Sequence, residues 1–225
     1  MKFIILILLF LVLIPSVSLP QSTDTAGIVN NLKSQLEKGE LTSQQILIDK
    51  DYMEIHYAES FRYLIKDYAP KAEIKITNEN EPGEKIKVTC EVKDESGNPV
   101  SDALVYIYQT DNRGYYGKDS PHILANEGDY RHARLFGYLY TDSSGKINIE
   151  TIKPVGYPKS TLPRHIHIVI SKEGYNYLGT ELLFDNDERL SEEQRKRALN
   201  EGFLISSFDN SKDIPSITYT LTIKK

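Results

Sequence analysis

The sequence predicts a mainly β protein: a β-sandwich over about residues 73–184, completed by a C-terminal strand at 217–223. Three observations support this fold class. Short runs alternate apolar and polar residues, which is the period of a half-buried strand. Tight turns rich in Asp, Ser, Gly and Pro separate those runs. Helical signals are confined to an N-terminal segment, where apolar residues recur at helical spacing, and to a capping box at 191–194 that begins one short helix near 192–200.

The alternating runs are clearest at residues 85–92, where every second residue is apolar. A turn at 94–99 and a second turn at 142–145 each connect two such runs. Further strand-like runs are found at 74–76, 103–109, 136–141, 146–151, 165–171 and 177–184. Many short strands with regular turns between them are typical of a sandwich.

Residues 26–68 are predicted to be helical. Apolar residues such as Ile28 and Leu32 recur at helical spacing, and Thr42–Gln45 has the pattern of a capping box that begins another helix. Pro70 ends this region. These helices are expected either to form a homodimer interface or to pack on the sandwich.

The first residues are typical of an export signal. Lys2 precedes an apolar run of 13 residues at 3–15, and Ser16–Ser18 offers small residues for cleavage. A run of that length is shorter than the roughly 20 residues that span a bilayer. We therefore expect a secreted or periplasmic protein, with an uncleaved membrane anchor as the alternative. The chain is divided into a signal peptide (1–18), a linker and helical segment (19–70) and a β-sandwich domain (71–225).

The composition is that of an ordinary globular protein, with 40% hydrophobic and 26% charged residues. The formal net charge is −5, whereas nucleic-acid binders typically have a basic surface. We therefore expect no nucleic-acid partner. The single cysteine, Cys90, lies on the apolar side of a strand and is interpreted as a small buried hydrophobe.

His165 and His167 are the most informative polar residues. They lie two apart on a predicted strand, so both side chains face the same side and could bind one metal ion. Two unconnected polar positions would give the same pattern. Tyr157 lies just upstream in a loop between prolines, and Tyr116 follows the turn at Gly114.

The order of these motifs resembles that of the intradiol ring-cleavage dioxygenases, the family of the protocatechuate and catechol dioxygenases. The resemblance covers about residues 80–184. It is carried by Gly97-x-Pro99, Gly114-x-Tyr116, Thr141-Asp-x-x-Gly145, Thr151-Ile-x-Pro154-x-x-Tyr157-Pro158 and Pro163-x-His165-Ile166-His167.

The resemblance implies an iron(III) ion bound by Tyr116, Tyr157, His165 and His167. Iron(III) is a hard cation that prefers anionic oxygen, which tyrosinate supplies. The resemblance also implies that a small aromatic diol chelates the iron and displaces Tyr157. Dioxygen then cleaves the ring between the two hydroxylated carbons. Tyr115 is the alternative to Tyr116, and Tyr108 is expected to have a packing role.

Two positions depart from the family pattern. Leu162 occupies the place of an arginine that stabilises negative charge on the substrate, and Arg164 is either its functional substitute or a surface cation. Glu181 falls where the family has a glutamine, and a carboxylate there should disfavour a dianionic substrate. Leu162 and Glu181 are therefore candidates for the wall of a substrate pocket.

These departures leave other functions open. One is an iron-binding sandwich with weak or no turnover that serves as a binding or structural module, and another is a metal-free adhesive or carbohydrate-binding sandwich. His122 and His132 lie in a loop that we expect to border the pocket mouth, where solvated positions are the simpler interpretation. His56 is interpreted as structural, and the acidic run at 185–188 as a solvated turn.

Overall fold

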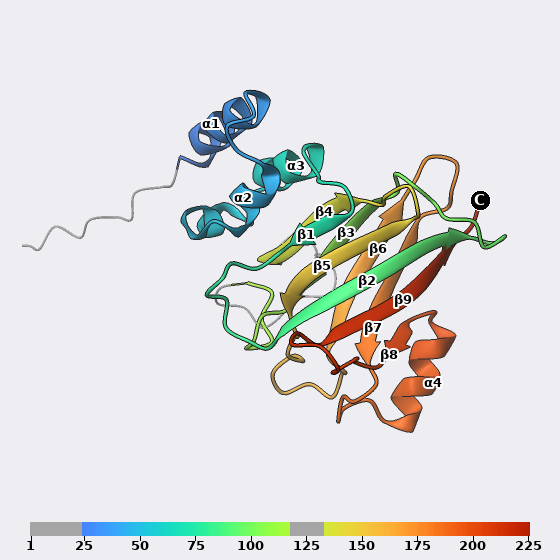
Figure 1. Ribbon diagram of the computed structural model, residues 1–225. Coiled ribbons are helices and arrows are strands. Elements are labelled where there is room, and N and C mark those ends of the chain that lie inside the picture. Colours follow the sequence, from blue (N-terminus) through green and yellow to red (C-terminus); the bar gives the residue numbers. More distant parts are fainter. Residues whose placement is uncertain (1–23, 118–132) are drawn as a thin grey trace, which may run out of the picture.

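The computed structural model describes residues 24–117 and 133–225, which form a sandwich of two β-sheets (Figure 1). In spatial order, the first sheet contains β1 (Glu73–Lys75), β5 (Lys146–Ile152), β2 (Lys85–Asp94) and β9 (Ser216–Ile223). The second contains β4 (Leu135–Tyr140), β3 (Leu104–Gln109), β6 (His165–Ser171), β7 (Leu178–Phe184) and β8 (Leu204–Ser206). The predicted fold class is confirmed.

The core of the sandwich is formed by apolar side chains that alternate along the strands. Val88 and Ile149 of the first sheet, and Ile107 and Ile168 of the second, are all at most 1% exposed and belong to one cluster. Burying each such side chain contributes about 1.5–3 kcal/mol to folding. The alternation that predicted the strands therefore also fixes which residues face the core.

The N-terminal helices pack on one end of this sandwich, beside β1 and β4 (Figure 1). They are α1 (Thr25–Glu37), α2 (Ser43–Ile48), the 3₁₀ helix η1 (Lys50–Ile55) and α3 (Glu59–Asp67). The predicted capping box at Thr42 and Gln45 is present. Leu32 and Phe61 are fully buried in the same cluster as the sheet residues, so the helical segment shares the sandwich core.

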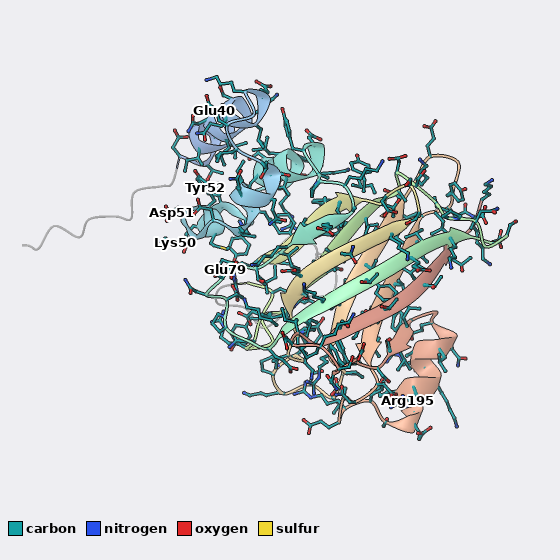
Figure 2. All side chains as sticks on the ribbon, viewed as in Figure 1. Glu40, Lys50, Asp51, Tyr52, Glu79 and Arg195 are labelled. Atoms are coloured by element: carbon teal, nitrogen blue, oxygen red, sulfur yellow. The ribbon has the colours of Figure 1, made fainter. Side chains whose placement is uncertain are left out.

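At the other end lies α4 (Glu192–Asn200), the predicted late helix, next to β7 and β8 (Figure 1). Arg195 projects from it, whereas Lys50 and Asp51 are exposed at the opposite end of the molecule (Figure 2). The short strand β8 was not predicted. Within the described ranges, none of the helices is long and apolar enough to span a membrane.

Two interpretations of single residues have opposite outcomes. Cys90 is fully buried as predicted, and burial raises the pKa of its thiol to about 12, so it remains a neutral hydrophobe. The solvated turn predicted at 185–188 is wrong for Asp187. This carboxylate is only 4% exposed, because it accepts hydrogen bonds from the backbone amides of Arg164 and Arg189.

Candidate metal centre and substrate cavity

The loop that carries Tyr116 is held by a buried carboxylate at its start. Asp111, two residues after the end of β3, accepts hydrogen bonds from the backbone amides of Arg113 at 2.8 Å and Tyr115 at 3.1 Å. Gly114 completes the turn with a φ of +80°, a conformation that side-chain-bearing residues rarely adopt. The backbone amide of Arg134 donates a hydrogen bond to the Tyr116 carbonyl oxygen at 2.8 Å, and the Tyr116 side chain is 1% exposed.

The loop that carries Tyr157 packs directly against this turn. A Cβ on Gly114 would lie 2.4 Å from the carbonyl oxygen of Gly156, so the two loops approach as closely as backbone atoms allow. The Thr110 hydroxyl also donates a hydrogen bond to the Val155 carbonyl at 2.7 Å. The two tyrosines therefore share one rigid support, although 41 residues separate them.

His165 and His167 come from the start of β6, on the face opposite to the buried Ile166 and Ile168. His165 Nδ1 lies 2.9 Å from the Pro163 carbonyl oxygen, which can only accept a hydrogen bond. The proton is therefore assigned to Nδ1, and the lone pair of Nε2 is directed into the site.

The ring of His167 is oriented by neighbours from two adjacent strands. The Tyr108 ring, from β3, stacks on it with centroids 4.3 Å apart and an interplanar angle of 7°. Glu181, from β7, places Oε1 3.6 Å from His167 Nδ1. Burial, with a smaller effect of the neighbouring His165, holds the pKa of His167 well below its usual value, so this imidazole is neutral and Nε2 can act as a ligand.

The structure brings all four predicted ligand atoms together. Tyr116 Oη lies 2.7 Å from Tyr157 Oη, 2.8 Å from His167 Nε2 and 3.5 Å from His165 Nε2. His165 Nε2 lies 3.0 Å from Tyr157 Oη and 3.1 Å from His167 Nε2. Donors about 2.1 Å from a common ion would be roughly 3.0–3.4 Å apart, so these separations fit one metal ion.

Glu181 also lies within reach of a metal ion, since its carboxylate and the two imidazoles have ligand atoms within 4.8 Å of one another. Its carboxylate, however, approaches Nδ1 of His167, on the side of the ring away from the Tyr116 hydroxyl. Glu181 is therefore better placed to orient the histidine ligand from behind than to bind the metal ion as a fifth ligand.

A cavity of about 330 Å³ opens above this cluster. Tyr157, His165 and His167 line it, but Tyr116 does not, so Tyr116 lies beneath the other three. Leu162 and Glu181, the two predicted pocket residues, both contribute to the wall. The opposite wall is formed by α4 and the residues that follow it, which the sequence did not connect to the site.

Arg164 does not lie at the cavity, where it would have to be in order to take over the role of the family arginine. Its Nε is 3.1 Å from Asp187 Oδ2, and its backbone amide donates to the same carboxylate at 2.6 Å. It is not among the residues that line the cavity. Arg164 directly precedes β6, and its side chain is paired with Asp187. The predicted role of Arg164 in stabilising substrate charge therefore finds no support in the geometry.

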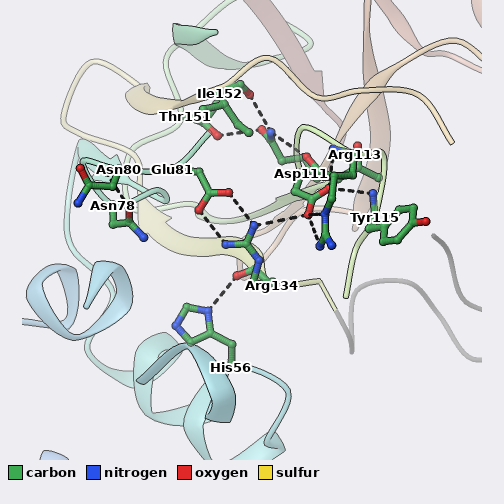
Figure 3. Close-up of polar contacts among 12 residues, drawn as sticks. His56, Asn78, Asn80, Glu81, Asp111, Arg113, Tyr115, Arg134, Thr151 and Ile152 are labelled. Carbon is green, nitrogen blue, oxygen red and sulfur yellow. Dashed lines mark hydrogen bonds and ion pairs between the residues drawn. The ribbon is translucent and has the colours of Figure 1, made fainter. Parts of the chain in front are cut away.

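A buried ionic network lies behind the loops that carry Tyr116 and Tyr157, and no sequence pattern predicted it (Figure 3). The Arg134 guanidinium makes two hydrogen bonds to Glu81, at 2.8 and 2.6 Å, and lies 3.7 Å from Asp111. His56 Nδ1 lies 2.9 Å from the Arg134 carbonyl oxygen. The network thus connects the N-terminal helices to the carboxylate that organises the Tyr116 loop. His122 and His132 lie outside the described residues.

Comparison with known proteins identifies the family. A family model described as "Dioxygenase" matches residues 59–224. Chlorocatechol 1,2-dioxygenase from Rhodococcus opacus is 33% identical over 128 residues, which cover 49% of this chain and 48% of that protein. The protocatechuate 3,4-dioxygenase beta chain from Burkholderia cepacia is 31% identical over 147 residues, which cover 62% of this chain and 60% of that protein.

Solved structures show the same fold. 3-Chlorocatechol 1,2-dioxygenase from Rhodococcus opacus has a TM-score of 0.55 at 22% identity, covering 91% of this chain and 90% of its own. An intradiol ring-cleavage dioxygenase from Tetranychus urticae has a TM-score of 0.56 at 22% identity, covering 69% and 87%.

The sandwich and its tyrosine–histidine cluster define a dioxygenase-type β protein. More narrowly, the chain belongs to the intradiol ring-cleavage dioxygenase family. It spans about half the length of the curated relatives it matches.

Proposed function

We propose that this protein is an intradiol dioxygenase, which binds ferric iron and uses dioxygen to cleave catechol-type rings between the two hydroxylated carbons. One observation carries this proposal. Two phenol oxygens and two imidazole nitrogens converge at the cavity floor, each within 3.5 Å of at least two others. Hard oxygen donors combined with imidazole suit iron(III).

The position of Tyr157 supports its role as the exchangeable ligand. Its side chain lines the cavity, whereas Tyr116 is enclosed beneath and is 1% exposed. Ferric iron, when bound, would withdraw electron density from a chelated catechol and make the ring reactive towards dioxygen. Tyr157 is the tyrosine that lines the cavity, so its Oη would be the phenol oxygen placed to accept a proton from a substrate hydroxyl. Tyr116 and the two histidines would remain as ligands.

Iron loading tests the ligand set. The loaded protein is expected to bind about one iron per chain and to show a visible tyrosinate-to-iron absorption band. Tyr116→Phe should lower iron content and weaken the band. Tyr115→Phe is the matched control, because Tyr115 is the neighbouring tyrosine and its ring lies against Arg113 outside the cluster. Equal effects of the two substitutions, or a colourless iron-free protein after loading, would contradict the proposed site.

Oxygen uptake tests the reaction. The iron-loaded protein should consume about one dioxygen per catechol and release a ring-opened dicarboxylic acid. Tyr157→Phe is expected to lower this rate strongly while Tyr115→Phe retains it. Iron-loaded protein that binds catechol and takes up no oxygen would contradict the proposed activity.

That last outcome would favour a second candidate, an iron-binding module with weak or no turnover. The specific observation behind it is the charge at the substrate. Leu162 replaces the family arginine, and Arg164 is engaged by Asp187. Leu162→Arg would then be expected to raise oxygen uptake, because it restores a cation to the cavity wall.

We also propose that the protein is exported. The supporting feature is the apolar run behind Lys2, which lies outside the described residues. Expression of the full chain, followed by cell fractionation and mass determination, should recover a product outside the cytoplasm that is cleaved near residue 18. A homodimer through the N-terminal helices stays a prediction, which analytical ultracentrifugation would test.

A further inference from the structure

We infer that the cavity selects catechols by the charge of the ring substituent, and that it prefers a cationic substituent to an anionic one. The inference rests on the proposed function, because it concerns the substrate of the same site. It comes from the wall that faces the donor cluster rather than from the donors themselves.

Two carboxylates line the cavity from opposite sides. Glu181 lies on β7 beside His167, and Glu201 follows α4. Their side chains are 24% and 40% exposed, so both are accessible to a molecule in the cavity. A catechol whose oxygens lie at the donor cluster would direct a ring substituent towards this wall, since the cavity extends from the cluster to α4.

The only cation among the described residues that line the cavity is Arg197 of α4. Its Nε donates to Glu201 Oε1 at 2.8 Å. This hydrogen bond, the charge of Glu201 and, to a smaller degree, the charge of Glu181 raise the pKa of Arg197. The guanidinium therefore interacts with both carboxylates, and an anionic substituent would have to compete with them for it.

Nearby arginines outside the wall have other partners. Arg164 is paired with Asp187, and Arg189 donates to the Tyr157 carbonyl at 3.2 Å. Arg195, the other arginine of α4, is bonded to Asp185. Among the described residues of the wall, Glu181 and Glu201 are negative and Arg197 is positive, which gives one net negative charge. This charge attracts an ammonium group and repels a carboxylate.

Equilibrium binding separates this preference from catalysis. The iron-loaded full-length protein is titrated without oxygen, using three probes that differ in one substituent: 4-methylcatechol, 3,4-dihydroxybenzylamine and 3,4-dihydroxybenzoate. We expect the amine to bind about tenfold more tightly than the acid at low ionic strength, with 4-methylcatechol between them. The ratio should shrink as salt is added, because the wall is partly exposed.

Glu201→Gln is the decisive variant. It removes one wall charge and releases Arg197 from its carboxylate partner, so the acid should gain affinity and the amine should lose it, by about threefold each. Glu192→Gln is the matched control, because it is an exposed glutamate of the same helix that does not line the cavity, and it should leave the ratio unchanged.

Equal or tighter binding of the acid by the unsubstituted protein would overturn the inference. Normal binding of 4-methylcatechol in the same titration, followed by its cleavage once oxygen is admitted, would show that the proposed function stands without it. If 4-methylcatechol neither binds nor is cleaved, the proposed function fails, and the inference fails with it.

Discussion

The two sides of the cavity are built in different ways. The donor side consists of side chains that are at most 8% exposed at Tyr116, Tyr157 and His165, supported by backbone hydrogen bonds and by contact between glycines. The α4 side consists of charged side chains, such as Arg197 at 63% and Glu201 at 40% exposure. The first arrangement fixes atoms in place, and the second sets a charge.

This difference implies that the donor side tolerates little change, whereas the α4 side can be altered without loss of the fold. Buried groups lose packing and hydrogen bonds together when one is removed. Exposed ion pairs contribute little to stability, because water solvates each partner almost as well. Substitutions on the donor side should therefore destabilise the protein more than substitutions on the α4 side.

Gly114→Ala should have the largest effect on the donor side. The new Cβ would lie 2.4 Å from the Gly156 carbonyl oxygen, at a φ of +80° that alanine rarely adopts. We expect a loss of about 3–5 kcal/mol in the free energy of unfolding, together with reduced iron binding, since both tyrosine loops must shift. Urea denaturation and iron content after loading measure the two effects.

Gly174→Ala is the matched control for that experiment. It has the same φ of +80°, but a Cβ there would meet nothing within 4 Å. Only the backbone cost of about 1–2 kcal/mol is expected, with normal iron content. Similar losses in the two variants would show that the contact between the tyrosine loops is unimportant.

Acidification should weaken the network behind the donor side by up to about 3 kcal/mol. Burial is the main reason that the pKa of His56 is lowered from 6.5 to about 4. Because the unfolded chain binds this proton more readily, the stability that neutral His56 contributes is complete above pH 6.5. It is lost as the pH falls towards 4, at about 1.4 kcal/mol per unit.

Urea unfolding of the unsubstituted protein and of His56→Asn, followed between pH 7 and pH 4, isolates this contribution from that of other groups. Asparagine retains a donor for the Arg134 carbonyl, which His56 Nδ1 contacts at 2.9 Å. The variant is expected to be less stable at pH 7 but to lose less stability on acidification. Parallel pH profiles of the two proteins would exclude His56 as the cause.

The donor side was also the side that the sequence revealed. Strand alternation predicted that His165 and His167 share a face, and Gly114 marked the turn before Tyr116. These signals are local, because spacing along one strand or turn determines where the side chains lie. The β-sandwich was predictable for the same reason, since each strand has its own alternating pattern.

The remaining parts of the site depend on contacts between distant segments. Glu81 and Arg134 are 53 residues apart, and neither has a local pattern that indicates a partner. Arg164 could be interpreted as a substrate contact only while its pairing with Asp187, 23 residues away, was unknown. The position of α4 over the cavity likewise follows from packing on β7 and β8, which no spacing in the sequence encodes.

Arg197→Met should have the smallest effect, although Arg197 lines the cavity. Its ion pair with Glu201 joins side chains that are 63% and 40% exposed, so we expect no measurable change in the free energy of unfolding and unchanged iron content. Arg134→Met is the buried counterpart: it leaves Glu81, with a side chain only 4% exposed, without its guanidinium and should cost about 3 kcal/mol. Urea denaturation of both variants compares them directly. Equal losses in the free energy of unfolding would mean that the exposed ion pair on the α4 side stabilises the protein as much as the buried pair behind the donor side.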